Sequence, residues 1–197
     1  MVNRMKKAAM FGLDARIALA IFGALSVISG AALYSAIEQS KLTAQLVSYK
    51  EIEKAIEQYY LDTGSLPPLS TTTSTTDLSA YALVEKPSGV TGWNGPYLSY
   101  EKYASGDALM LNGSRFALMY KEPSNSLTGT CTKSSAECMV FIWYGKVDLA
   151  FGKKMNEFID NEDSTASSNY TGLIQYYLDY HAYKTALHFN PANSPNT

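Results

Sequence analysis

The feature that most constrains this chain is an uninterrupted apolar run from Ile17 to Ile37. The run carries no charged side chain, and its only polar groups are three serine hydroxyls and one tyrosine hydroxyl. A helix of about 20 residues spans the ~30 Å hydrocarbon core of a bilayer. The sequence therefore predicts a chain that is tethered to a membrane near its N-terminus.

The flanks of this run predict its orientation. A single acid, Asp14, stands before the run, together with four basic residues: Arg4, Lys6, Lys7 and Arg16. A basic excess on the short side predicts that the N-terminus stays cytoplasmic and that the rest of the chain is exported. A cleavable secretory signal, cut near Gly30, is the alternative. Such signals have a shorter apolar stretch, of roughly 7–15 residues, so we favour a retained anchor.

The composition suits one exported domain after the run. The net charge is −2 and charged residues make up 17% of the chain, with no basic patch beyond the N-terminus, which argues against a nucleic-acid binder. Cys131 and Cys138 enclose a short loop, and in an oxidising compartment they are expected to form a disulfide. A metal pair or two free thiols are the alternatives, although neither His181 nor His188 is close in sequence.

The helix is predicted to continue beyond the membrane, over residues 14–63 in all. Apolar residues recur at steps of three and four on one face: Leu42, Leu46, Tyr49, Ile52, Ile56 and Tyr59 or Tyr60. The opposite face is expected to meet solvent, with Lys41, Gln45, Lys50, Glu53, Lys54 and Glu57. Gly64 and the prolines Pro67 and Pro68 predict that the helix ends at Thr63. The apolar stripe is expected to pack under a head domain.

The rest of the chain predicts a head of short strands. Apolar and aromatic runs bounded by turn residues indicate strands at Ala108–Leu111, Arg115–Tyr120 and Met139–Val147. Leu149–Phe158 is expected to form a short helix and Ile159–Asn169 a polar loop. Gly172–Tyr180 reads as a last strand or helix, and the residues from Asn190 form a flexible tail. The fold class is α+β.

Two segments carry a resemblance to a known family. Ala55–Pro67, at the end of the long helix, and Gly92–Leu98, with its Trp-Asn-Gly-Pro-Tyr-Leu order, are similar to type IV pilins and to pseudopilins of type II secretion. The likeness is greatest to the major pseudopilin. Phe158–Asp163 and Gly172–Tyr176 resemble a C-terminal motif of pilin-like proteins more loosely.

The resemblance implies a long helix packed on a small antiparallel sheet. The chain is expected to divide into a basic leader or cytoplasmic segment (1–13), the helix (14–63) with its membrane span (17–37), the head (64–189) and a tail (190–197). The resemblance also implies a structural filament subunit whose partners are copies of itself or related pilins and an inner-membrane assembly platform, with a prepilin peptidase as a possible partner. The subunit would sit in the bacterial inner membrane with its head periplasmic, or extracellular in a filament.

The leader departs from the family pattern, which has a glycine before the cleavage point and an acid at the fifth mature position. Cleavage after Ala9 would start the chain at Met10 and make Asp14 the fifth residue, without the glycine. Cleavage after Gly12 would start it at Leu13 and leave an isoleucine fifth. An acid there would pair with the amino terminus of a neighbouring subunit, which is N-methylated in the family. Pairing of Asp14 with a nearby basic residue and an uncleaved chain are the alternatives.

Two further sets of residues are candidate sites. Gly23, Ser26 and Gly30 provide small surfaces for helix–helix packing, although such residues are common in membrane helices. The acidic cluster Asp160, Glu162 and Asp163 has the oxygen chemistry for calcium but lacks the spacing of a standard calcium loop, so a solvated acidic loop is the simpler interpretation.

No catalytic motif was found, so we predict neither an enzyme nor a cofactor. His181 and His188 stand seven residues apart without a third ligand and are interpreted as incidental. Trp93 and Tyr97 are expected to stabilise the fold. A non-polymerising, anchored periplasmic binding module with the same head is the alternative function.

Overall fold

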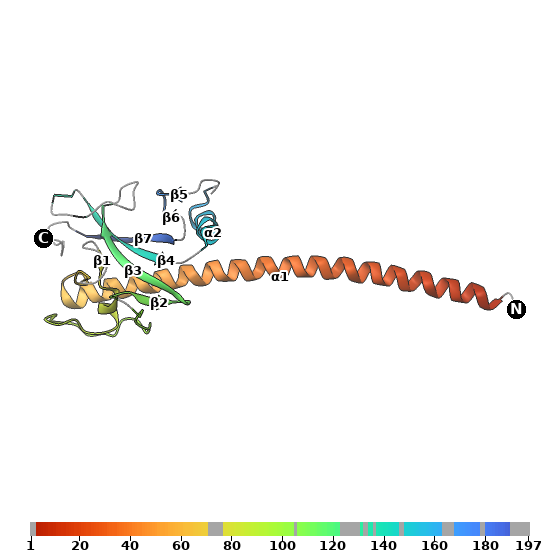
Figure 1. Cartoon of the computed structure of the whole chain (residues 1–197), viewed down its shortest axis with the longest axis horizontal. Helices are drawn as coiled ribbons and strands as arrows, with labels where there is room; N and C mark the ends of the chain where they lie inside the picture. The colour runs from red at the N-terminus through yellow and green to blue at the C-terminus, as the bar shows by residue number, and fades with distance from the viewer. Residues whose placement is uncertain are drawn as a thin grey trace. The chain divides into compact units, whose positions relative to one another are not determined.

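The computed structural model describes residues 3–70, 77–104, 106–122, 131, 134–135, 137–145, 148–162, 168–177 and 180–189, with side chains from Gly12 onward except those of residues 168, 169 and 180. Its long helix is α1 (Asn3–Thr63), and a 3-10 helix, η1, covers Ala80–Leu83. The other elements are β1 (Asp77–Leu78), β2 (Leu109–Leu111), β3 (Ser114–Lys121), β4 (Cys138–Gly145), α2 (Leu149–Asp160), β5 (Ser168–Asn169), β6 (Ile174–Tyr177) and β7 (Tyr180–Phe189) (Figure 1). The chain divides into two compact units, residues 1–44 and 45–197.

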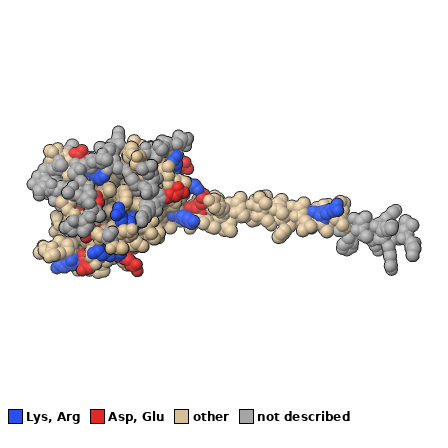
Figure 2. Space-filling model, in the orientation of Figure 1, with Lys and Arg blue, Asp and Glu red and all other residues tan. Residues whose placement is uncertain are grey.

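The first unit is the apolar part of α1. Large apolar side chains are exposed all around it, including Leu19 and Phe22 at 70% and Val27 at 74%. Figure 2 shows a long part of this helix without charged side chains, which corresponds to residues 17–37. By length and composition α1 is able to cross a membrane near the N-terminus. The predicted apolar helix is confirmed.

The second unit is a head built on an antiparallel sheet. The strand order is β1-β3-β4-β7-β6-β5, and β2 also pairs with β3. The C-terminal part of α1, residues 45–63, packs on one face of this sheet and is buried along its apolar stripe: Tyr49, Ile52, Ala55, Ile56 and Tyr59. Helix α2 packs on β6 and β7. The α+β architecture and the packing of the stripe are confirmed.

The register of the sheet explains the core. Phe116 pairs with Tyr144 and Leu118 with Ile142 across β3 and β4, and all four are buried. Because side chains alternate between the faces of a sheet, these residues share one face. The opposite face carries a smaller apolar cluster around Phe141.

Local signals account for the ends of both helices. The amide of Gly64 donates to the carbonyl of Tyr60 at 2.8 Å, and Gly64 has the left-handed φ of +70° that glycine permits at a helix C-terminus. At the start of α2, the carboxylate of Asp148 accepts a hydrogen bond from the amide of Ala150 at 3.2 Å. The predicted end of the long helix at Thr63 is confirmed.

The expected elements of the head are present, with shifted bounds. The three predicted strands correspond to β2, β3 and β4, and the predicted short helix is α2, which continues to Asp160. The expected polar loop at 159–169 therefore begins after Asp160, and its last two residues form β5. The strand alternative for 172–180 is correct, since β6 forms there. The end of the third predicted strand at Val147 and the tail from Asn190 lie outside the described residues.

Two expectations about polar residues were wrong. Gln45 and Glu53 were placed on the solvent face of the helix, but they are only 4% and 8% exposed. Gln45 accepts a hydrogen bond from the side chain of Asn112 at 3.3 Å. For Glu53 the reason is β7, for which the sequence predicted no element. Its Ala186 amide donates to the Glu53 carboxylate, which also receives a hydrogen bond from Lys50 at 2.8 Å. The sheet thus covers more of α1 than the apolar stripe alone.

Candidate functional site: the anchor, the helix exit and the disulfide

The small residues of the apolar run lie on an open helix surface. At both Gly23 and Gly30, the position that a Cβ would occupy has no neighbouring atom within 4 Å. The hydroxyl of Ser26 donates to the carbonyl of Phe22 at 2.8 Å, so its hydrogen-bonding need is met within the helix. These positions leave room for close approach of another helix, which stays a prediction.

The predicted processing residues all lie within the helical span of α1. Ala9 and Met10 belong to the helix, but their side chains are outside the described part. Gly12, Leu13 and Asp14 are exposed. An exposed Asp14 carboxylate is available to a group outside this chain, and where the leader is cut stays a prediction.

The end of α1 is held by the segment Gly92–Tyr97, which we call the helix-exit clasp. The hydroxyl of Tyr97 donates to the Asp62 carboxylate at 2.9 Å and accepts from the Asn94 amide at 2.9 Å. Burial raises the pKa of Tyr97, so its hydroxyl stays protonated and able to donate. Trp93 donates from its indole nitrogen to the carbonyl of Ala82 at 2.9 Å. The clasp ties the last turn of α1 to η1.

Two glycines of the clasp are required by close approach. A Cβ on Gly92 would lie 2.3 Å from the carbonyl oxygen of Asp62, and Gly92 has a φ of +76°. A Cβ on Gly95 would lie 2.7 Å from the Trp93 ring and 2.8 Å from the Tyr97 ring. The two rings themselves pack edge to face at 5.6 Å. The glycines therefore allow the chain to pass over the helix end and between the aromatic side chains.

The clasp and the helix end are the two segments on which the sequence resemblance rests, and here they are in contact. Residues 32–123 match the family model described as type II secretion system (T2SS), protein G. This segment, just under half of the chain, is similar to the major pseudopilin of type II secretion. No curated protein and no solved structure matches the chain. Residues 124–197 lie beyond the matched segment.

The match indicates the class of function. A protein G pseudopilin is a structural subunit of the pseudopilus, which it forms together with other subunits, and it is not an enzyme. The resemblance to the major pseudopilin is confirmed. The expected role of Trp93 and Tyr97 agrees with their place in the clasp.

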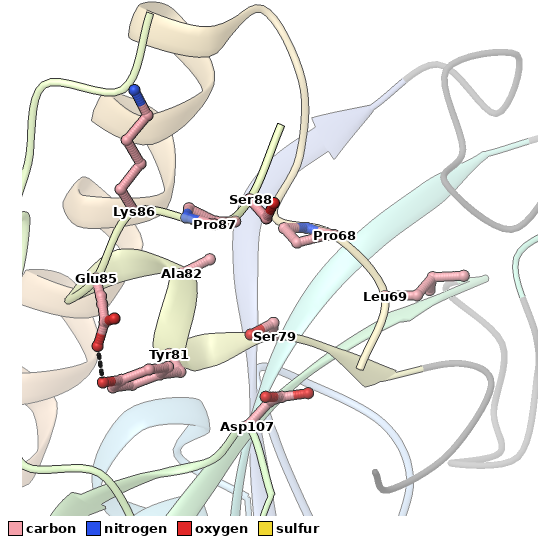
Figure 3. A pocket seen from close by; sticks show the side chains of 10 residues that line it. All are labelled: Pro68, Leu69, Ser79, Tyr81, Ala82, Glu85, Lys86, Pro87, Ser88 and Asp107. Atoms are coloured by element: carbon pink, nitrogen blue, oxygen red, sulfur yellow. Dashed lines mark hydrogen bonds between the residues drawn. The ribbon is translucent and has the colours of Figure 1, made fainter. Parts of the chain in front are cut away.

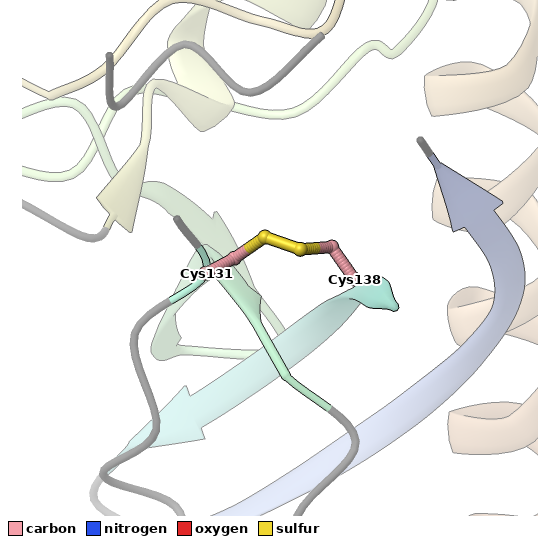
Figure 4. Close-up of a disulfide and its surroundings, with 2 residues drawn as sticks. All are labelled: Cys131 and Cys138. Atoms are coloured by element: carbon pink, nitrogen blue, oxygen red, sulfur yellow. A yellow bond between two sulfur atoms is a disulfide. The ribbon is translucent and has the colours of Figure 1, made fainter. Parts of the chain in front are cut away.

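The predicted disulfide is present between Cys131 and Cys138 (Figure 4). Both cysteines are fully buried, and their Cα atoms are 5.8 Å apart, within the usual range for a disulfide. Cys138 is the first residue of β4, and β4 pairs with β3. The bond therefore fixes the end of the β3–β4 connection to a central strand.

Replacing both cysteines, as in Cys131→Ala with Cys138→Ala, is expected to lower the free energy of unfolding by about 2–3 kcal/mol. The loop-closure model attributes this to the greater freedom of the unfolded chain without the cross-link. Urea unfolding of the full-length pseudopilin in non-ionic detergent, with and without reductant, measures the effect. Equal midpoints for wild type and the double variant under oxidising conditions would contradict it.

In the acidic cluster that was a candidate for calcium binding, Asp160 makes hydrogen bonds to the backbone. The two carboxylate oxygens of Asp160 accept hydrogen bonds from the amides of Leu173 at 2.9 Å and Ile174 at 2.8 Å. Within the described residues, no three His, Cys, Asp or Glu side chains converge as metal ligands. Glu162 is exposed, and Asp163 lies outside the described residues. Asp160 fixes the entry to β6, and calcium binding at this loop stays a prediction.

A surface hollow of about 300 Å³ lies beside η1 (Figure 3). Two carboxylates line it, and each already accepts a hydrogen bond from a hydroxyl. Tyr81 donates to Glu85, and Ser70 donates to Asp107 at 2.9 Å. The first bond joins η1 to the residues that follow it, and the second joins Ser70 to the segment before β2, so we interpret the hollow as a consequence of the packing of these segments.

The sequence analysis missed the burial of His181. His181, Tyr183 and Thr185 are buried on one face of β7, but Ala182 on the other face is buried as well, and only Ala186 and His188 are exposed among the described side chains of this strand. Because residues of both faces are buried in the first half of β7, the sequence shows no clean alternation that would have predicted this strand. Lysine and alanine in the same segment also weaken the strand propensity.

Proposed function

We propose that this pseudopilin is anchored in the bacterial inner membrane by the apolar run of α1, and that its apolar helix packs against those of other subunits in the pseudopilus. The observation that carries the proposal is the exposure of this run on all sides. Side chains such as Phe22 and Val27 are 70% and 74% exposed among the described residues. A continuous apolar surface of this kind needs lipid or other helices around it.

The proposed topology places the N-terminus in the cytoplasm and the head in the periplasm. Basic residues dominate the short N-terminal flank, which favours its retention on the cytoplasmic side. A buried disulfide in the head fits an oxidising compartment. The topology and the disulfide thus point to the same side of the membrane for the head.

The proposed partners are copies of this chain or related pilins, together with an inner-membrane assembly platform. Gly23, Ser26 and Gly30 provide the small surface for contact between helices. Asp14, placed just before the apolar run, would pair with the amino terminus of a neighbour, because an unpaired carboxylate at this depth is costly. Processing by a prepilin peptidase would create that amino terminus.

Intact mass measurement with N-terminal fragmentation tests the proposal, applied to the protein from inner membranes and from sheared filaments. We expect the same chain in both fractions, beginning at Met10 or Leu13 and N-methylated. A start at Met10 would make Asp14 the fifth residue, as pairing with a neighbour requires.

Other outcomes separate the alternatives. A chain that begins at Met1 and is absent from sheared filaments would support the anchored binding module and overturn polymerisation. A chain that begins beyond Gly30 would show that the apolar run is a discarded signal.

A further inference from the structure

A histidine is buried at the contact between α1 and the sheet. His181 of β7 is fully buried, and its Nε2 shares a hydrogen bond with the hydroxyl of Tyr49 on α1. The ring also lies against Tyr144 of β4, at a centroid distance of 5.4 Å, and Phe151 of α2, at 5.8 Å. Four elements of the head therefore meet at one imidazole.

The second ring nitrogen has no such partner. Nδ1 of His181 is buried without a hydrogen bond within the described residues. If Nε2 accepts from Tyr49, Nδ1 carries a hydrogen that it cannot donate. If Nε2 donates instead, the lone pair of Nδ1 is unsatisfied. Either tautomer costs free energy, so hydrogen bonding alone does not explain a histidine here.

The surroundings oppose a positive charge on the ring. The titratable groups found against the ring in the described residues are the phenols of Tyr49 on α1, Tyr144 on β4 and Tyr176 on β6, which pairs with His181 in the sheet. Helix α2 contributes an aromatic ring and Gly152, whose Cβ would lie 3.6 Å from that of His181. Burial raises the pKa of Tyr49 and of Tyr144, so both remain neutral in acid. No carboxylate among these groups could compensate an imidazolium.

We propose that His181 is an acid-sensitive latch, which holds α1 on the sheet while it is neutral and opens this contact when it takes up a proton. The imidazolium cannot accept from Tyr49, and its charge cannot remain among apolar and phenolic groups. Two neighbouring contacts also require β7 to stay in place against α1. Tyr183 stacks on Tyr49 at 5.0 Å, and the amide of Ala186 donates to Glu53.

The direction of the pH dependence follows from burial, which lowers the pKa of His181 to about 3. In the open state the imidazole is solvated and has the ordinary histidine pKa of about 6.5. The full contribution of the latch is present above about pH 6.5. This contribution is lost as the pH falls below that value toward the pKa of the folded state. The equilibrium constant for opening then rises by roughly a factor of ten per pH unit.

Hydrogen exchange of the full-length protein in detergent tests the latch. After correction for the intrinsic rates, we expect the protection of amides in β7 to fall about thirtyfold between pH 7.5 and pH 5 through His181. His181→Gln keeps a hydrogen-bonding partner for Tyr49 but does not titrate, so this variant should lack the fall in β7 protection that His181 causes. His188→Gln, which changes an exposed histidine on the same strand, should retain it.

A second measurement needs no variant. In the NMR spectrum of the wild-type protein, we expect the His181 ring signals to stay those of a neutral imidazole in the folded state at pH 5. A His181 ring that titrates near pH 6.5 without loss of β7 protection would overturn the latch. Equal pH dependence of protection in wild type and His181→Gln would overturn it as well.

Discussion

Gly92→Ala is expected to destabilise the head by roughly 3 kcal/mol or more. The new Cβ would lie 2.3 Å from the carbonyl oxygen of Asp62. That oxygen belongs to the backbone of the last turn of α1, so it cannot rotate away, and overpacking is added to the strain of a φ of +76°. Either the clasp or the end of α1 must move. Urea unfolding of the full-length pseudopilin in detergent, followed by the fluorescence of Trp93 and Trp143, measures the loss.

Gly89→Ala is the matched control for this substitution. Gly89 has nearly the same backbone conformation, with a φ of +77°, but no atom lies within 4 Å of the position of its Cβ. We expect it to cost about 1 kcal/mol from backbone strain alone. Equal losses for the two variants would contradict close contact between the clasp and the helix end.

Ile56→Ala should lower the free energy of unfolding by about 2–5 kcal/mol. Ile56 is fully buried on the face of α1 that packs on the sheet, and truncation removes buried apolar surface and leaves a cavity. The same unfolding measurement in detergent reports the change. It tests whether the C-terminal part of α1 belongs to the core of the head.

Leu61→Ala provides the comparison on the same helix. Leu61 is 69% exposed, so its truncation should change stability by no more than about 0.5 kcal/mol. A loss at Ile56 as small as that at Leu61 would mean that the head folds without this part of α1.

The proposed latch joins a residue inside the family match to one outside it. Tyr49 lies within residues 32–123, whereas His181 lies in the C-terminal part beyond the match. The same holds for Glu53 and its contact with the Ala186 amide. The family match thus covers the second half of α1 and the clasp, and the structure of this chain shows what β7 adds to them.

Local signals were sufficient for several features of this pseudopilin. The apolar run predicted the anchor helix, the stripe from Tyr49 to Tyr59 predicted the buried face, and Gly64 predicted the helix end. The close spacing of Cys131 and Cys138 predicted the disulfide. Periodicity, backbone conformation and short loop closure act between residues near in sequence, so the sequence alone determines them.

Other features were decided only by the tertiary structure. The placement of β7 between β4 and β6 buries His181, and on α1 it buries Glu53, against the predicted solvent face. The contact of Tyr97 with Asp62 and the use of Asp160 by amides of the β6 entry are likewise long-range. Burial of a polar side chain depends on which distant segments cover it and offer it hydrogen bonds, and local periodicity carries no information about those partners.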